Sequence, residues 1–455
     1  MGFALSVLYF ATHYLTPPTL FGPLAAAHIE VILALLVSAV SLPTLPRSFI
    51  FRTPQSLALI GLAFAVALSV LIGAHWPGGG VHAFFDFIPN AFGYFLVCLH
   101  CNSKKRLQIL VVSLLFVCLF VIAHGFADLV RGFPDSALIQ PDFTGSPYLM
   151  AMNNGTGGWL FRLRGLGEIH DPNDFGQLLV CMIPLMFIFW RARKLLRNLI
   201  CVILPVALLL AGVYLTHSRG ALVALLAVMI LAARRRIGTV PSLVIAGVLF
   251  VALMALNFTG GRAISVETGS DRTALWGESL QLLKSHPVFG VGFGFLPDYL
   301  GHTAHNSVAV CAAELGLFGL YCWCLFLFPT VKDTLEVASP RKLRDGKPIV
   351  REQGLYPNET RKVEDLDKAE VNYLGQLMLL ALTGFLVAGW FLSRAFVTTL
   401  FMLGGMAEVI FEKALQREMI APRMRLARVV PYSGMLAVSL IVFMYIMLRT
   451  VNLMR

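Results

Sequence analysis

A series of apolar runs, each long enough to cross a membrane as a helix, recurs along the whole chain and constrains its fold more than any other feature. About 20 apolar residues in a helix span the hydrocarbon core of a bilayer. Hydrophobic residues make up 57% of the chain and charged residues 13%, whereas a soluble domain is about one-quarter charged. The sequence therefore predicts an all-α polytopic membrane protein, with residues 1–455 in a single membrane domain.

These runs predict about 12 or 13 transmembrane helices. Charged residues, Pro or Gly bound the runs, which lie near residues 3–16, 25–43, 55–74, 82–99, 107–129, 173–190, 198–216, 220–233, 240–257, 304–330, 371–393, 395–411 and 431–448. The first run has no basic segment before it and no small-residue cleavage site, which favours a retained helix over a signal peptide. Three longer polar stretches separate some of the runs, at residues 130–172, 258–304 and 332–370.

Lys and Arg clusters occur at every second boundary between the apolar runs and indicate how the chain is oriented. Examples are residues 104–106, 191–197, 234–236 and 341–347. Because positive loops remain in the cytoplasm, the stretches 130–172 and 258–304 are predicted to face outside, and the charged loop 332–370 to face the cytoplasm. The net charge of +11 consists largely of such topology signals, so no nucleic-acid partner is expected.

Three further patterns are interpreted as noncatalytic. Asp365 and Asp367 form a D-x-D pattern, but two acids in a densely charged loop are expected by chance. Gly290, Gly292 and Gly294 form a GxGxG run that precedes no strand–helix unit, so tight turns against a ligand or against re-entrant backbone explain it better than dinucleotide binding. The basic stretch 412–428 is predicted to lie along the anionic inner leaflet.

Four polar sets at the predicted outer side are functional candidates, because charged groups near hydrocarbon are costly. In the first set, Arg162 and Arg164 come shortly before Asp171 and Asn173 at a helix start. Helix capping by the Asp and Asn, and snorkelling of the arginines to the interface, are the structural alternatives. The second set holds Arg219, with only 14 residues between it and Arg234, or about 21 Å of helix. Since this is shorter than the membrane core, Arg219 is predicted to lie below the outer surface, and a snorkelling or structurally paired arginine is the alternative.

The other two sets lie in or beside the stretch 258–304. Arg272 and Trp276 are predicted to lie on an amphipathic helix that begins at Asp271, where the alternative for Arg272 is a pair with Glu278 or Glu267. His302 and His305 are spaced to share one face of a helix start and are followed by Asn306. Since no third metal-ligand set is evident, a general-base histidine is favoured over zinc binding, and a structural pair is the alternative.

Five motifs in this order resemble those of the O-antigen ligase and polymerase superfamily of membrane glycosyltransferases. They are RxRGLGEIHDPNDFGQ, THSRGALVAL, DRTALW, SHPVFGVGFG and HTAHNSVAVCAAELGLFG, within about residues 160–330. Among the branches of the superfamily, the chain is most similar to the exopolysaccharide and O-glycosylation ligase-like proteins.

The resemblance implies a fold, an activity and a set of site residues. The family fold is a bundle of about a dozen transmembrane helices with an external segment late in the chain. Its members move a glycan from an undecaprenyl-diphosphate carrier to an acceptor hydroxyl at the outer face of the bacterial inner membrane, without a metal. The family's SRG arginine corresponds to Arg219, its R-x-x-x-W arginine to Arg272 and its HN histidine to His305, while Arg164 is the arginine of the RG segment.

The residue types suit this chemistry independently of the resemblance. Arginines stabilise a departing diphosphate through charge-assisted hydrogen bonds, and His305 is placed to accept the acceptor's proton in a single displacement that inverts the sugar. The substrate-binding candidates are Arg162, Arg164, Asp171, Asn173, Trp276, His302 and Asn306. No cofactor and no metal are expected, and the expected partners are the glycan donor, a glycan, lipid or protein acceptor, and the bilayer. A polymerase of the same superfamily and a flippase for a lipid-linked glycan remain the alternatives.

Overall fold

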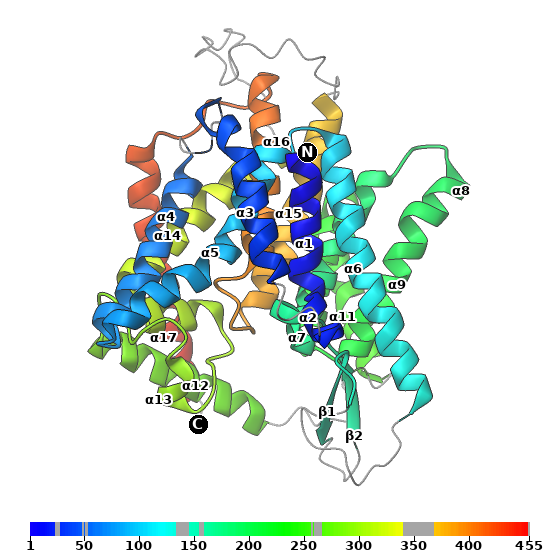
Figure 1. Cartoon of the computed structure of the whole chain (residues 1–455). Helices are drawn as coiled ribbons and strands as arrows, with labels where there is room; N and C mark the ends of the chain where they lie inside the picture. Colours follow the sequence, from blue (N-terminus) through cyan, green and yellow to red (C-terminus); the bar gives the residue numbers. More distant parts are fainter. Residues whose placement is uncertain are drawn as a thin grey trace. The chain divides into compact units, whose positions relative to one another are not determined.

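The computed structural model describes residues 1–22, 28–47, 50, 53–132, 145–153, 159–255, 258, 266–339 and 368–453, and these are helical almost throughout (Figure 1). The helices are α1 (Gly2–Leu15), α2 (Pro17–Leu20), α3 (Ile29–Ser41), α4 (Pro54–Leu68), α5 (Pro77–His100), α6 (Lys104–Arg131), α7 (Pro172–Leu185), α8 (Leu195–Asn198), α9 (Leu204–Thr216), α10 (Arg219–Ile237), α11 (Thr239–Ala255), α12 (Val266–Ser285), α13 (Leu296–Leu300), α14 (Ser307–Ala338), α15 (Lys368–Gly389), α16 (Thr398–Gln416) and α17 (Leu426–Leu453). Each predicted apolar run overlaps one of them, which confirms the all-α membrane class.

Eight helical spans in the described residues are long and apolar enough to cross a membrane. They are Pro54–Gly73, Pro77–His100, Lys104–Arg131, Pro172–Phe189, Leu195–Thr216, Ser307–Ala338, Lys368–Gly389 and Leu426–Thr450. The apolar helices at Gly2–Leu15, Ile29–Leu45 and Thr239–Leu253 are shorter. Helices α10 and α16 have 19 residues each and carry more charged side chains, which lie at both ends of α10 and in the second half of α16. The predicted count of 12 or 13 spans is therefore reached only if these shorter or more charged helices also cross.

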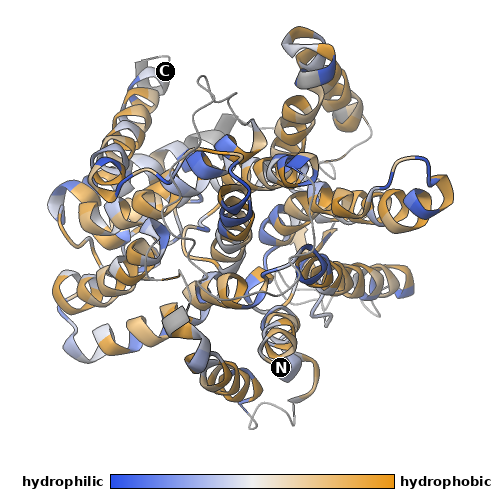
Figure 2. Ribbon diagram, turned by 90° about the horizontal axis from the view of Figure 1, so that it is seen from above, coloured by the Kyte–Doolittle hydropathy of each residue, from blue (hydrophilic) through white to orange (hydrophobic). Residues whose placement is uncertain are grey.

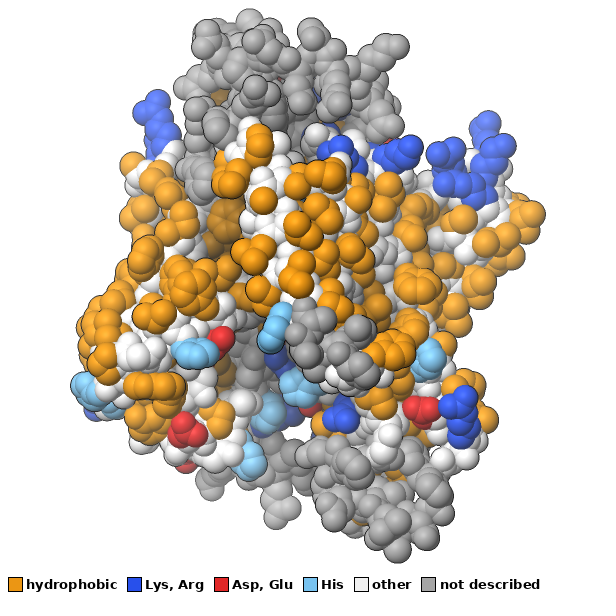
Figure 3. All heavy atoms as spheres, viewed as in Figure 1, with side chains coloured by type: hydrophobic (Ala, Val, Ile, Leu, Met, Phe, Trp, Pro, Cys, Tyr) orange, Lys and Arg blue, Asp and Glu red, His pale blue; other side chains and the backbone are white. Residues whose placement is uncertain are grey.

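The outward surfaces of the helices are strongly apolar. Hydrophobic residues cover most of each helix in Figure 2, and in Figure 3 they cover the middle of the helices while Lys, Arg and His side chains lie toward the ends. Large apolar side chains such as Leu35 and Phe116 are 67% and 66% exposed. Contiguous exposed apolar surface of this kind marks contact with lipid.

The chain divides into two compact units. The first unit contains Met1–Leu42, His100–Ile264 and Leu377–Ala388, and the second contains Pro43–Leu99, Ser265–Gln376 and Gly389–Arg455. In each unit the most buried spanning segment is central. In the first unit this segment is Pro172–Phe189, which begins with α7, and in the second unit it is α14. In each of them 83% of the residues in the most apolar stretch are buried. Helices α6, α9 and α10 pack on α7, and α4, α12, α16 and α17 pack on α14.

The first unit also carries the one β-hairpin in the described part of the chain. Strands β1 (Leu149–Asn153) and β2 (Trp159–Leu163) pair antiparallel, with Met150 opposite Arg162. The hairpin lies in the stretch 130–172, where the sequence analysis expected only an external loop. It is short, but it determines where Arg162 and Arg164 lie.

In the second unit α14 is interrupted at Gly316, whose φ of 65° lies in the left-handed region. The segment Pro287–Gly294 runs beside this break, and four backbone hydrogen bonds join them: Leu317 N to Pro287 O, Phe318 N to Val288 O, Val291 N to Ala313 O and Gly292 N to Glu314 O. A Cβ atom on Gly290 would lie 2.4 Å from the backbone of Glu314. The glycine run therefore forms turns packed against the backbone of α14, as the sequence analysis favoured over dinucleotide binding.

Candidate functional site

In the first unit Arg162 is buried and donates hydrogen bonds to the ends of two helices. It is 3% exposed, and its Nε donates to the carbonyl of Thr216 at the end of α9 over 2.9 Å. Its Nη2 donates to Oδ1 of Asn173, in the first turn of α7, over 2.8 Å. These bonds join β2 to the end of α9 and to the start of α7. The guanidinium of Arg162 therefore holds these three elements together, which favours a structural role over ligand binding.

Asp171 has the capping role that was the structural alternative in the sequence analysis. It is the residue before α7, and its Oδ1 accepts a hydrogen bond from the backbone N–H of Asn173 at 2.7 Å. Arg164, two residues after Arg162 on the chain, is held by its backbone N–H to Tyr148 O and by its Nε to Pro147 O. Its side chain is half-buried. Arg164 is therefore better placed than Arg162 to meet a ligand.

Arg219 is the first residue of α10, which begins in a turn packed against α7. Ser218 caps α10 by accepting from the N–H of Ala221, and His217, at a φ of 47°, ends α9. The close approach is made at Gly176 of α7, where a Cβ atom would lie 2.8 Å from the Cβ of Ala221. The starts of α7 and α10 therefore lie together, and Arg219 stands half-buried beside them.

A buried histidine between two carboxylates lies in the same unit and was missed by the sequence analysis. Nδ1 of His13 lies 2.6 Å from Oε1 of Glu30, and its Nε2 lies 3.6 Å from Oε2 of Glu168. Glu168 belongs to the segment between Arg164 and Asp171. A Cβ atom on the neighbouring Gly167 would lie 3.1 Å from the carbonyl of His13. No spacing rule joins residues so far apart in sequence, so no local pattern could have predicted this cluster.

In the second unit Trp276 connects α12 to the residues before α14. Its Nε1 donates to the carbonyl of Ala304 over 2.8 Å, and its ring meets that of Trp390 edge-on, with the centroids 6.1 Å apart. Arg272 lies one helical turn earlier on α12 and therefore on the same side as Trp276. Arg272 is half-buried. The prediction that this helix begins at Asp271 is wrong, because α12 begins five residues earlier, at Val266. The side chain of Asp271 lies outside the described residues.

The two histidines near the start of α14 differ in their surroundings. His302 is exposed, whereas His305 is half-buried and has a φ of 50°, a strained value for a nonglycine residue. The backbone N–H of His305 donates to Oγ of Ser393 over 2.9 Å. Asn306 is fully buried and caps α14, because its Oδ1 accepts from the N–H groups of Val308 and Ala309. The structure thus assigns Asn306 a capping role beside His305.

The predicted site residues thus fall into two groups, one in each unit. The first unit has Arg162, Arg164, Asp171, Asn173 and Arg219, and the second has Arg272, Trp276, His302, His305 and Asn306. Among the described residues no group of three or more His, Cys, Asp or Glu side chains is arranged to hold a metal ion.

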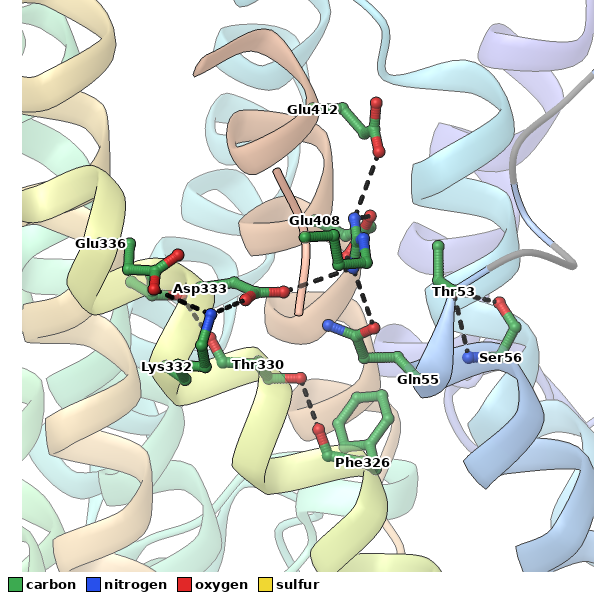
Figure 4. Close-up of polar contacts among 12 residues, drawn as sticks. Thr53, Gln55, Ser56, Phe326, Thr330, Lys332, Asp333, Glu336, Glu408 and Glu412 are labelled. Carbon is green, nitrogen blue, oxygen red and sulfur yellow. Dashed lines mark hydrogen bonds and ion pairs between the residues drawn. The ribbon is translucent and has the colours of Figure 1, made fainter. Parts of the chain in front are cut away.

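A second charged cluster lies in the second unit at the end of α14 opposite His305 (Figure 4). The guanidinium of Arg423 bonds both carboxylate oxygens of Glu408, and it also reaches Glu412 at 3.2 Å, Asp333 at 3.3 Å and Gln55 at 3.3 Å. Burial alone would lower the pKa of Arg423, but the carboxylate charges outweigh it and raise that pKa above its usual value. The sequence analysis placed the whole basic stretch 412–428 along the inner leaflet, and the structure adds that the guanidinium of Arg423 in this stretch faces carboxylates of the protein.

The fold and the two residue groups define a polytopic helical membrane protein whose polar side chains gather at the helix ends. The sequence model of the O-antigen ligase family matches residues 204–324, from α9 into α14. The match covers about a quarter of the chain and supports its membership of the O-antigen ligase-like superfamily. The matched range contains Arg219, Arg272, Trp276 and His305. A comparison with curated proteins found no match.

Proposed function

We propose that this protein is a membrane glycosyltransferase that moves an oligo- or polysaccharide from undecaprenyl diphosphate to an acceptor hydroxyl at the outer face of the inner membrane. The observation that carries the proposal is the family match over residues 204–324, which contains two arginines and the histidine suited to this reaction. Arg219 and Arg272 bind the diphosphate, and His305 is the general base. The isoprenoid tail of the carrier lies between helices.

The reaction is a single displacement at the anomeric carbon. The acceptor oxygen forms a bond to this carbon as its proton passes to the imidazole of His305, and the bond from the carbon to the diphosphate oxygen breaks with its electron pair on that oxygen. Guanidinium groups stabilise the charge that develops there, because paired N–H donors match phosphate oxygens. One displacement inverts the configuration of the sugar.

Substitution tests these roles. We expect His305→Ala and Arg219→Ala each to lower glycan transfer by roughly a hundredfold or more, the usual loss for a general base or a charge-stabilising group. The matched controls are His82→Ala, whose side chain is 80% exposed, and Arg236→Ala, an exposed residue near the other end of α10. If both site variants transfer glycan like the controls at equal protein levels, the assigned roles are wrong.

The same purified protein separates the related activities. Incubation with lipid-linked glycan yields longer carrier-linked chains from a polymerase, and a modified lipid or protein from a ligase. A flippase moves labelled glycan across vesicles without forming a glycosidic bond. We expect transfer to continue with a chelator present, and strict dependence on a divalent cation would refute the arginine-based mechanism.

A further inference from the structure

A short basic segment of the first unit, residues 190–198, links the span Pro172–Phe189 to the span that begins at Leu195. A connection between two consecutive spans lies at a membrane surface. Its sequence, WRARKLLRN, contains four Lys or Arg residues, and residues 190–196 are all exposed. This segment is called the basic loop below.

The side chain of Asn198 closes the basic loop and gives it a fixed shape. Asn198 is 2% exposed, its Oδ1 accepts from the backbone N–H of Arg191 at 2.9 Å, and its Nδ2 donates to the carbonyl of Arg191 at 2.6 Å. The backbone N–H of Asn198 also donates to the carbonyl of Lys194 at 2.9 Å. Between these bonds Arg193 has a φ of 62°, in the left-handed region, which completes the turn. The exposed basic side chains therefore project from a defined backbone.

Carboxylates of the protein do not balance the charge of the basic loop. The sequence has no Asp or Glu between Asp174 and Glu267. None of the salt bridges formed within the described residues involves a side chain of the loop. At the base of the loop, Nη1 of Arg197 is buried and has no hydrogen-bond partner in the described part of the chain. The loop is therefore a surface of positive charge.

The start of α6 lies beside the basic loop and adds to this positive charge. Nε2 of Gln108 on α6 donates to the carbonyl of Ile188, two residues before the loop, over 3.3 Å. The first turn of α6 contains Lys105 and Arg106, and the guanidinium of Arg106 donates to uncharged acceptors, the carbonyl of His100 and Oδ1 of Asn102. Like charges that lie close together repel, and an anion bound among them lowers this repulsion.

Strongly exposed apolar side chains adjoin the basic ones. Leu195 and Leu196 are 84% and 71% exposed, and Trp190 is 44% exposed. Figure 3 shows hydrophobic side chains beside Lys and Arg side chains around α8, the helix labelled in Figure 1 that contains both leucines. Tryptophan is enriched at the level of the lipid headgroups, and exposed leucines suit the acyl chains just below them. A phospholipid offers both surfaces in one molecule.

We propose that the basic loop, closed by Asn198, binds an anionic phospholipid. The phosphate of the lipid lies among the side chains of Arg191, Arg193 and Lys194, and its acyl chains pack against the two leucines. A guanidinium donates to two phosphate oxygens at once, and the ammonium of Lys194 adds a compact positive charge. Phosphatidylcholine carries a cationic amine beside its phosphate, which these side chains repel, whereas phosphatidylglycerol carries none. The loop therefore selects anionic headgroups, and this role is independent of the proposed transferase function.

The first experiment compares two double variants of the full chain. Arg193→Gln with Lys194→Gln removes two charges from the loop and leaves the bonds of Asn198 in place, because their partners are backbone atoms. Arg234→Gln with Arg236→Gln is the matched control, since it removes two exposed arginines near the end of α10 in the same unit. Native mass spectrometry of protein titrated in micelles with phosphatidylglycerol or phosphatidylcholine gives the dissociation constant of each lipid.

We expect the wild type to bind phosphatidylglycerol more tightly than phosphatidylcholine. The loop variant is expected to bind phosphatidylglycerol roughly tenfold or more weakly and the control about twofold or less, because each basic side chain beside an anionic headgroup contributes to binding. The affinity for phosphatidylcholine is expected to be the same in all three proteins. Wild-type affinity for phosphatidylglycerol in the loop variant, or equal losses in the two variants, overturns the proposal.

A second variant, Asn198→Ala, separates a site of fixed shape from attraction by charge alone. It keeps every basic side chain and removes both bonds that close the loop. We expect it to bind phosphatidylglycerol roughly threefold or more weakly than the wild type, because the basic side chains lose their common backbone arrangement. Unchanged affinity in this variant shows that charge alone attracts the lipid and refutes the site.

The wild type provides a test that does not depend on a folded variant. An amine-reactive ester labels exposed lysines of the full chain in nanodiscs of phosphatidylglycerol or phosphatidylcholine, and peptide mass spectrometry reports each position. We expect Lys194 to be protected in phosphatidylglycerol only. Lys284, an exposed lysine of α12 with no other Lys or Arg within ten positions, is expected to react equally in both lipids. Equal labelling of Lys194 in the two lipids refutes the proposal.

Discussion

Replacing Arg423 with alanine is expected to destabilise the protein more than any other single arginine substitution proposed here. The variant removes the guanidinium and leaves Glu408, Glu412 and Asp333 behind, whose side chains are 0%, 6% and 5% exposed. Breaking a buried ion pair by deleting one partner costs about 3–5 kcal/mol. Protonation of the remaining carboxyls limits the cost, since a neutral acid is far less expensive to bury than a carboxylate.

The magnitude follows from the number of groups that lose a partner. Arg423 bonds both oxygens of Glu408 and one oxygen each of Glu412, Asp333 and Gln55, and its guanidinium lies 4.6 Å from the ring centroid of Phe411. The ring contact adds about 0.5–1 kcal/mol. These contributions share one guanidinium and are not additive, so we expect a total loss of about 4 kcal/mol.

The assay is reversible unfolding of the full chain in mixed micelles, with Arg425→Ala as the exposed control. We expect the control to stay within about 0.5 kcal/mol of wild type. Adding Glu408→Gln to Arg423→Ala is expected to restore part of the loss, because it removes one carboxyl that lost its partner. If Arg423→Ala unfolds at the same free energy as Arg425→Ala, the cluster does not stabilise the fold and the reasoning is wrong.

Three further predictions concern local structure. Gly316→Ala is expected to lower the free energy of unfolding by at least about 1–2 kcal/mol in the same assay, because its Cβ would lie 2.4 Å from Val288 O at a left-handed φ; an unchanged midpoint would contradict this. Asp171→Ala is expected to cost about 1 kcal/mol through loss of the α7 cap, and Asp171→Asn to restore most of it. Arg162→Met is expected to lower stability by about 2–4 kcal/mol, since it leaves Thr216 O and Asn173 without their donor, and a variant as stable as wild type but inactive would instead favour a direct substrate role.

The features that could be predicted from sequence are those that depend on neighbouring residues. Apolar runs bounded by charge predicted the helices, and Asp171 followed by Pro172 predicted a helix start, because span length and capping are both local properties. The glycines at 290–294 predicted tight turns for the same reason.

Features that depend on contacts between distant segments could not be predicted. Arg423 lies in a basic stretch that has the composition of a membrane-surface segment, and its partner Asp333 is 90 residues earlier. Ser393 lies in the connection between α15 and α16, which has no recognisable motif, and is placed beside His305 only by the fold. Likewise, nothing near His13 indicated that Glu168 would face it. In each case the contact joins segments that come close together only in the folded chain.

The backbone hydrogen bonds between Pro287–Gly294 and the break in α14 limit how this protein can be recombined with other helical membrane proteins. Since four hydrogen bonds and two glycines join the segments, each requires the other's backbone geometry. A chimera that exchanges α12 and α13 but keeps the resident α14 separates the two sides of these hydrogen bonds. Residues 287–318 should therefore be exchanged together, with the crossover points of any chimera before residue 287 or after residue 318.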